Sequence, residues 1–286
     1  MKSKNYDIIF LSLARDCSST INFFFNFLLE LSNKGHKVLS IIGENGSQDY
    51  TFDEIRKFSD NNSELVTFLD TTFIEQFSDR IIRLSKARQF LKDYITKNKI
   101  ECEYLCVIDV DNVLSKNFST KDFYLIKNEL DSRTEDTFAV SVKSKPFYYD
   151  ILNFESYEFK NLNIMQIQND RRFSTFFKRK KNIYDVQKAL TVKDDFFSIS
   201  SFNGMCLYKF NHFIQGNYYE ENNNNPMPEH LNLNRRIHKI TGKKILVSEK
   251  IELLMPVEHR PIFNLFNFIY QKFIKYILIY FRKLND

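Results

Sequence analysis

The chain has 286 residues, a net charge of +5, and an apolar fraction of 43% that includes no tryptophan. This apolar content supplies a sizeable core and excludes a disordered chain, and the length allows one large domain or a domain with an appendage. The four cysteines, Cys17, Cys102, Cys106 and Cys206, are too few and too scattered for a disulfide framework or a zinc site. The first residues lack the apolar segment of a signal peptide. We therefore expect reduced thiols in a cytoplasmic protein.

The first half of the chain alternates between apolar runs of strand length and stretches with helical spacing. Strands are expected at residues 7–13, 36–42, 65–69, 104–108 and 138–142, with helices at 18–34, 53–61 and 78–98. Strand character resumes at residues 201–208. Strands that alternate with helices form a mainly parallel sheet with helices on both faces. The sequence therefore predicts an α/β fold of the doubly wound, Rossmann type.

Two later segments have little periodicity. Residues 155–200 are basic and aromatic, and the charge run at residues 178–181 is either a solvated surface or a contact for an anionic acceptor or phosphate. Residues 220–226 contain four consecutive asparagines and are expected to form a loop that serves as a lid.

A pair of carboxylates follows the apolar run that begins at Tyr104. Asp109 and Asp111 stand two residues apart where this buried strand ends, at the edge of the sheet where α/β proteins bind ligands. Side chains two apart on a strand share a face, and carboxylate oxygens suit Mg²⁺ or Mn²⁺. The pair therefore predicts a divalent-cation site that neutralises a diphosphate leaving group, although such a triplet also arises by chance.

The tail, residues 256–286, differs from the preceding domain at residues 1–255. From Arg260 onward its net charge is +4, so most of the excess positive charge of the chain is local. A polar stripe runs along an otherwise largely aromatic and aliphatic helix: Asn264, Asn267, Gln271, Lys275 and Arg282. Lysines interrupt the apolar run, so an amphipathic helix in the interface of an anionic membrane fits better than a spanning helix. The alternative is a helix that docks on the protein's own core or on a second copy of the chain in a homo-oligomer.

Seven short motifs occur in a fixed order along residues 7–250. They are Ser12-Leu-Ala-Arg15-Asp16-Cys17, Glu44-Asn-Gly-Ser47, Ala87-Arg88-Gln89, Asp109-Val-Asp111, Phe147-Tyr-Tyr-Asp150, Phe202-Asn-Gly-Met205 and Glu229-His230. Together they resemble a bacterial and large-virus group of GT-A-fold glycosyltransferases that is similar to capsule-associated mannosyltransferases. The resemblance implies a GT-A-like fold and transfer of a sugar from a UDP- or GDP-sugar to a cell-envelope glycan or lipid-linked acceptor.

The resemblance also implies roles for individual residues. Asp109, Asp111 and His230 would hold Mn²⁺ or Mg²⁺ on the diphosphate, where the metal acts as a Lewis acid. The donor nucleotide would be bound by a set that also includes Asp109: Arg15, Asp16, Glu44, Ser47 and Arg88. We expect a nucleotide sugar, a glycan or glycolipid acceptor and the inner face of the membrane as partners, and no nucleic acid.

An inverting reaction needs a carboxylate base, for which the candidates are Asp150, Asp194 and Asp195. Three of the residues given a role above also have an ordinary structural interpretation: Asp150 as a helix cap, His230 as a polar contact and Arg88 as an exposed residue.

The sequence departs from the group's pattern at three places. Gln89 stands in place of Asn, Asn153-Phe-Glu in place of Ala-Leu-Arg, and Pro228 in place of Cys. These differences concern acceptor binding more than donor binding.

Two other functions are compatible with parts of the sequence. Residues 109–113 also fit the signature of haloacid-dehalogenase-like phosphatases, with Asp109 as nucleophile and Asp194 and Asp195 as later metal-binding acids. In that family, however, the signature follows the first strand, whereas two β-α units precede it here. The other alternative is a non-catalytic binding protein at the membrane surface.

Overall fold

The computed structural model describes residues 4–111, 118–159, 175–219 and 227–256. The strands are β1 Lys4–Ala14, β2 Val38–Glu44, β3 Val66–Asp70, β4 Ile100–Ile108, β5 Thr137–Lys145, β6 Phe196–Ser198, β7 Met205–Lys209 and β8 Lys244–Leu254. The helices are α1 Ile21–Asn33, α2 Thr51–Asn61, α3 Arg80–Lys97, α4 Thr120–Ser132, α6 Thr175–Arg179, α7 Asp185–Val192, α8 Phe210–Phe213 and α9 Glu229–Thr241. A 3-10 turn, η1 (Thr72–Gln76), precedes α3, and a π-helical turn, η2 (Lys180–Tyr184), joins α6 to α7.

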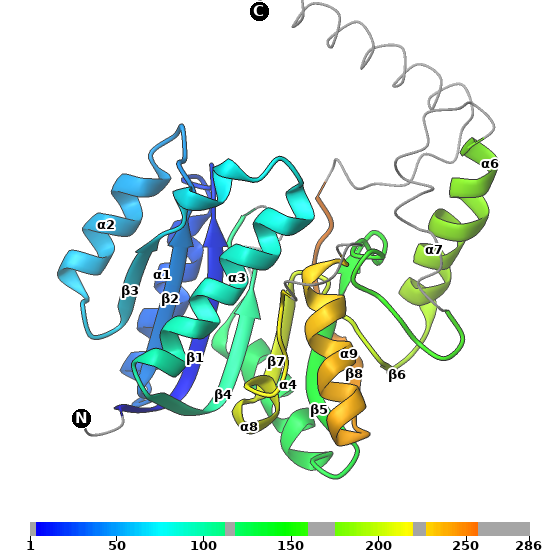
Figure 1. Ribbon diagram of the computed structural model, residues 1–286. Coiled ribbons are helices and arrows are strands. Elements are labelled where there is room, and N and C mark those ends of the chain that lie inside the picture. The colour runs from blue at the N-terminus through cyan, green and yellow to red at the C-terminus, as the bar shows by residue number, and fades with distance from the viewer. Residues whose placement is uncertain (1–3, 112–117, 160–174, 220–226, 257–286) are drawn as a thin grey trace, which may run out of the picture.

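All eight strands form one sheet in the order β3-β2-β1-β4-β7-β5-β8-β6 (Figure 1). β1 pairs in parallel with β2 and β4, β2 with β3, and β5 with β8. β7 runs antiparallel to both β4 and β5, and β6 runs antiparallel to β8. The predicted α/β fold with a mainly parallel sheet is confirmed, and the sheet is mixed because β7, between β4 and β5, and the edge strand β6 run antiparallel to their neighbours.

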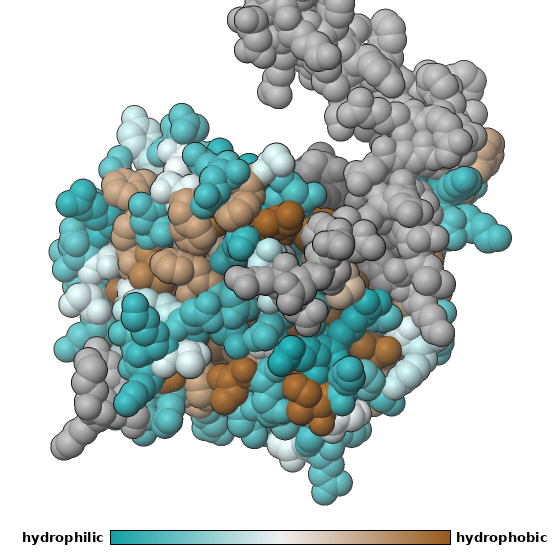
Figure 2. All heavy atoms as spheres, viewed as in Figure 1, coloured by the Kyte–Doolittle hydropathy of each residue, from teal (hydrophilic) through white to brown (hydrophobic). Residues whose placement is uncertain are grey.

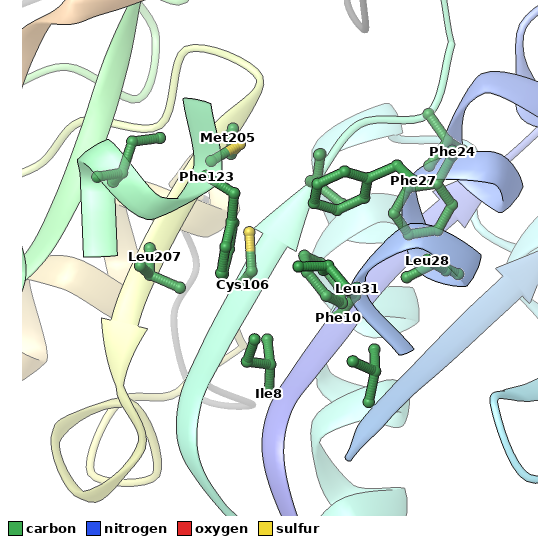
Figure 3. Close-up of a cluster of buried hydrophobic side chains, with 14 of the residues drawn as sticks. Ile8, Phe10, Phe24, Phe27, Leu28, Leu31, Cys106, Phe123, Met205 and Leu207 are labelled. Atoms are coloured by element: carbon green, nitrogen blue, oxygen red, sulfur yellow. The ribbon is translucent and has the colours of Figure 1, made fainter. Parts of the chain in front are cut away.

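The period-two alternation of the strands places side chains on both faces of the sheet. Ile8, Phe10 and Cys106 pack with α1 and α4 on one face, as Figure 3 shows. Phe10 contacts Phe27 of α1 edge-to-face, with 5.5 Å between ring centroids. Such a pair adds about 0.5–1.5 kcal/mol beyond the burial of its apolar area. This aromatic packing fixes β1 and β4 at the centre of the sheet.

The other face of the sheet is covered by α3, α8 and α9 (Figure 1). Leu91 and Ile95 of α3 and Leu233 and Ile237 of α9 pack there against the alternate side chains of the central strands. Because α3 and α9 lie on the same face, residues near their ends can meet above the carboxyl end of β4. A third apolar cluster lies under α7 and β6 and contains Tyr148 and Phe154.

The predicted elements of the first 110 residues all occur, with boundaries that differ by a few residues. Beyond them the sequence analysis missed α4, α6, α7, α8, α9, β6 and β8. All four cysteines are free thiols, as predicted. The predicted lid and the amphipathic tail lie outside the described residues.

The described surface is mostly hydrophilic on the face shown in Figure 2, with apolar side chains interspersed. Phe73 of η1 and Phe90 of α3, each about two-fifths exposed, contact one another. Among the helices of the described residues, none combines the length and the apolar character needed to cross a bilayer.

Candidate active site

The acidic pair lies directly beyond β4, at the edge of the sheet where the parallel strands end. The backbone N–H of Asp109 donates to the carbonyl of Gly204 at 2.9 Å, which ties this loop to the turn before β7. Val110, between the two acids, is fully buried. The Asp109 side chain is 24% exposed and Asp111 is exposed. The partly exposed Asp109 and the exposed Asp111 thus flank a buried residue beyond β4, and their sharing of one face and one cation stays a prediction.

Arg88 projects from α3 to the acidic pair and is 6% exposed. Its Nη2 donates to Asp109 Oδ1 at 3.0 Å, and its Nε lies 3.6 Å from Glu229 Oε1. Burial lowers the pKa of the guanidinium, but the two carboxylates outweigh this effect and raise it. Burial raises the pKa of Asp109, which Arg88 opposes. The alternative in which Arg88 is simply an exposed helix residue is wrong.

His230 lies on the first turn of α9 and is fully buried. Its ring stacks on Phe202 with 3.7 Å between centroids, and Tyr218 covers its edge. Neither ring nitrogen has a hydrogen-bond partner within the described residues, and burial, together with the nearby Arg88, lowers the pKa of the imidazole well below its usual value. The ring is therefore neutral and enclosed by aromatic side chains.

The predicted three-residue metal set is not formed. In the part of the chain that the structure describes, no three His, Cys, Asp or Glu side chains gather to a metal-binding group. The structure does not bring His230 to Asp109 and Asp111, because the aromatic stack holds its ring inside the protein. The two carboxylates themselves fit a hard cation, because Mg²⁺ is usually bound by one or two carboxylates plus substrate phosphates and water.

Tyr149 and Asp150 reach the same region from the loop after β5. The Tyr149 hydroxyl donates to Asp109 Oδ2 at 3.4 Å, and Asn203 Oδ1 accepts from the backbone N–H groups of Tyr149 and Asp150. Asn203 is fully buried with φ +52°, a backbone conformation that asparagine tolerates better than most residues. The sequence analysis noted the Asn-Gly pair only as part of a motif. Its turn chemistry was the signal that could have identified Asn203 as the residue that positions this loop.

The Asp150 carboxylate is partly buried and receives two sets of hydrogen bonds. Asn153 Nδ2 lies 3.0 Å and 3.1 Å from its two oxygens, and the backbone N–H of Asn203 donates at 3.4 Å. Burial first, and then the charges of Glu229 and Asp109, raise the pKa of Asp150 to about 7, although both donors act in the opposite direction. A carboxylate with this pKa can gain or lose a proton near neutral pH.

The residues predicted to bind the donor nucleotide form one group of loops at the ends of β1 and β2. Ala14 and Glu44 are in register, and the Ser47 hydroxyl accepts from the backbone N–H of Asp16 at 3.1 Å. Glu44 is buried and accepts from the backbone N–H of Ser47 at 2.6 Å. The side chain of Arg15 is about half exposed, and its Nε lies 3.7 Å from Asp16 Oδ2. The structure thus brings these four residues together, and three of them also stabilise the loops themselves.

Asp194 and Asp195 lie apart from the other candidates. They precede β6, which is four strands from β4 in the sheet and therefore about 19 Å away at the usual spacing of strands. Asp195 Oδ1 accepts from the backbone N–H of Glu249 at 2.8 Å. The prediction that these residues act as a catalytic base is therefore not supported, and the phosphatase alternative loses its second pair of acids. Both residues belong to the edge between β6 and β8.

Comparisons with known proteins give a result for the fold. No protein-family model matches the sequence, and no curated protein matches it. Among solved structures, the mannosyltransferase PcManGT from Pyrobaculum calidifontis in complex with GDP-Man and Mn²⁺ is similar, with a TM-score of 0.51 and 11% identity; the match covers 96% of this chain and 65% of that chain. The chain has a GT-A glycosyltransferase fold.

Two further GT-A structures are similar at lower scores. Mannosyl-3-phosphoglycerate synthase from Rubrobacter xylanophilus matches with a TM-score of 0.47 and 8% identity, over 98% of this chain and 75% of its own. Glucosyl-3-phosphoglycerate synthase from Mycobacterium tuberculosis, in complex with Mn²⁺, UDP and glucosyl-3-phosphoglycerate, matches with a TM-score of 0.45 and 10% identity, over 90% of this chain and 73% of its own. This chain thus spans about two thirds of the length of the Pyrobaculum protein. In the GT-A fold of this chain, the acidic pair, Arg88 and Asp150 lie at the carboxyl edge of the central strands.

Proposed function

We propose that this protein is a divalent-metal-dependent glycosyltransferase, which moves a sugar from a nucleotide sugar to a glycan or glycolipid acceptor. The observation that carries the proposal is the position of Asp109 and Asp111 beyond β4 in a GT-A fold, next to the buried cation of Arg88. The Pyrobaculum structure, which contains GDP-Man and Mn²⁺, supports this proposal. A cell-envelope acceptor, as in capsule synthesis, is part of the same proposal and rests on the motif resemblance.

Asp109 and Asp111 would hold Mn²⁺ or Mg²⁺, which supplies charge neutralisation for a departing nucleoside diphosphate. The chain's own residues do the rest. The loops that contain Arg15, Asp16 and Ser47 would bind the nucleoside. Arg88 holds the Asp109 carboxylate in place and opposes the rise of its pKa that burial causes. Glu44 stabilises the loop after β2, because its carboxylate accepts a hydrogen bond from the backbone N–H of Ser47.

Asp150 is the candidate base for the acceptor hydroxyl. A base must be ionised to accept a proton, so transfer should increase with pH up to about 7, the pKa of Asp150, and then level off. The stability of the fold should change in the opposite sense. The pKa of Asp150 in the folded protein exceeds the unfolded value of about 3.9. The contribution of protonated Asp150 to the free energy of unfolding is therefore complete below pH 3.9, roughly, and is lost as the pH rises to about 7.

The donor is identified by a panel of UDP-, GDP- and CMP-sugars, each added with and without Mn²⁺. We expect one nucleotide class to raise the melting temperature only with the metal, because a ligand that binds the native state stabilises it by mass action. A concentration of one hundred times the dissociation constant would add about 2.7 kcal/mol. Asp194→Ala, an exposed acid outside the site, is the matched control and should respond like the wild type. The proposal would be contradicted if none of these nucleotide sugars raised the melting temperature, or if they raised it by the same amount without Mn²⁺.

We also propose that the tail, residues 256–286, attaches the enzyme to the inner face of the membrane. The proposal rests on the net charge of +4 beyond Arg260 and on the apolar residues around its polar stripe. Deletion of residues 262–286 should leave metal-dependent donor binding unchanged and abolish binding to anionic liposomes. Raised salt should weaken the binding of the full chain only in part, because salt screens charge but not apolar burial. A truncated protein that unfolds or changes its oligomeric state would instead favour the docking-helix alternative.

A further inference from the structure

Asn153 lies between two parts of the site that the sequence separates widely. Its side chain is 7% exposed, and it hydrogen-bonds Asp150 with one end and the first turn of α9 with the other. Nδ2 is 3.0 Å and 3.1 Å from the Asp150 oxygens, while Oδ1 accepts from the backbone N–H groups of His230 and Leu231 at 3.1 Å and 3.2 Å. We propose that Asn153 is a positioning residue that fixes the Asp150 carboxylate to the amino end of α9.

The chemistry of an amide suits this position. The carboxylate of Asp150 needs a donor, and the free N–H groups at the start of a helix need an acceptor. The Asn side chain presents an NH₂ donor and a carbonyl acceptor on one planar group, and here each end meets the partner of its own kind. The opposite orientation of the amide would face oxygen to carboxylate and N–H to N–H, so the contacts themselves determine which end is which.

The local sequence of α9 explains why the cap comes from a distant residue. The N-cap position is Pro228, whose side chain makes no capping hydrogen bond. Asn153 supplies the missing acceptor from a loop more than 70 residues earlier in the chain. Asn153 is also one of the residues at which this sequence departs from the motif pattern of the glycosyltransferases that it resembles.

The first turn of α9 connects this amide to the acidic pair. Glu229, the first residue of α9, pairs with Arg88, and Arg88 in turn donates to Asp109. Asp150 is held on the other side by Asn203, and the next residue, Gly204, accepts the backbone N–H of Asp109. The contacts thus form a closed ring from Asp109 through α9 and Asn153 to Asp150. A change at Asn153 opens this ring without removing any charge.

Two substitutions separate the two ends of the amide. Asn153→Asp keeps an acceptor for α9 but removes the donor to Asp150, whereas Asn153→Ala removes both. Asn234→Ala is the matched control, because Asn234 is a buried asparagine of α9 that hydrogen-bonds Tyr208 and Ser200 instead of Asp150. Amide hydrogen exchange of His230 and Leu231 reports on the cap. The titration of Asp150, assigned by carboxyl-carbon NMR against Asp150→Asn, reports on the donor, and neither measurement needs a substrate.

We expect Asn153→Ala to increase exchange at His230 and Leu231 at least about tenfold, and to raise the titration midpoint of Asp150 by about one pH unit. The size of the shift follows from loss of a hydrogen bond to a charged group. Asn153→Asp should keep the protection of α9 and raise the midpoint at least as far, because it also adds a negative charge. Asn234→Ala should lower stability and leave the midpoint of Asp150 unchanged. Unchanged midpoints in both Asn153 variants, or an equal shift in Asn234→Ala, would overturn the inference.

The catalytic consequence rests on the proposed function. If Asp150 is the base, the acidic limb of the transfer rate should move up in pH together with the NMR midpoint in Asn153→Asp. Shifted midpoints in a protein that binds no nucleotide sugar would support the positioning role while the glycosyltransferase assignment fails. If the protein is instead shown to transfer sugar, but the Asp150 midpoint is unchanged in both Asn153 variants, the glycosyltransferase assignment stands and the positioning role fails.

Discussion

Replacement of Asp111 by alanine is expected to abolish metal-dependent donor binding while the free energy of unfolding stays within about 0.5 kcal/mol of the wild type. Asp111 is exposed at the end of β4, so its carboxylate contributes charge at the sheet edge and no packing in the core. Loss of several kcal/mol of charge stabilisation, taken as about 3 kcal/mol, corresponds to a decrease in transfer rate of about a hundredfold. Product formation at saturating donor and Mn²⁺ measures this change.

Two variants make the Asp111 result specific. Asp111→Asn keeps the size of the side chain and removes the charge, so it should fail like Asp111→Ala. Asp194→Ala removes an equally exposed carboxylate at the β6 end of the sheet and should retain transfer, because β6 lies four strands from β4. An Asp111→Ala enzyme with full activity would show that the acidic pair is not the metal site. An Asp194→Ala enzyme without activity would show that the β6 end of the sheet also takes part in transfer.

The predicted part of the fold is the part that local patterns determine. β1, α1, β2 and β4 have clear apolar periods, and their side chains form the core on both faces of the sheet. α9 was missed for two physical reasons. Its buried face includes Asn232 and Asn234, which weaken the apolar pattern, and its cap is supplied by Asn153 rather than by a neighbouring residue. No local signal marks a cap that comes from a distant loop.

The candidate site follows the same division. Asp109 and Asp111 were predicted because a strand end is visible in the sequence, and the position of Arg88 beside them confirms that α3 faces this edge. The burial of His230 depends on Phe202 and Tyr218, which lie at other places in the chain, and so it could not be predicted. The separation of Asp194 and Asp195 from the other candidates could not be predicted either, because the order of strands in the sheet is a non-local property.

Replacement of Arg88 by methionine is expected to have the largest effect on stability of any single change at the site. Arg88 is 6% exposed and faces two carboxylates, Asp109 at 3.0 Å and Glu229 at 3.6 Å. Methionine retains much of the packing against Phe202 but leaves both acids without a cation. Removal of one partner of a buried ion pair costs about 3–5 kcal/mol, and chemical denaturation at neutral pH measures it. Lys92→Met removes another buried cation one turn further along α3, where Asp93 is the acid whose charge acts on it, and should cost much less.

A double-mutant cycle with Asp109→Asn separates charge from packing in this result. Asparagine at position 109 removes one of the uncompensated charges, so Arg88→Met should be less destabilising in that background than in the wild type. Coupling between residues in contact commonly reaches about 0.5–3 kcal/mol, and this buried pair should lie toward the upper end. Lower pH should also lessen the cost of Arg88→Met, because the stranded carboxylates bind protons more readily without the guanidinium. If the decreases in the free energy of unfolding caused by Arg88→Met and Asp109→Asn are additive and do not change with pH, Arg88 stabilises the fold by packing rather than by holding Asp109 and Glu229.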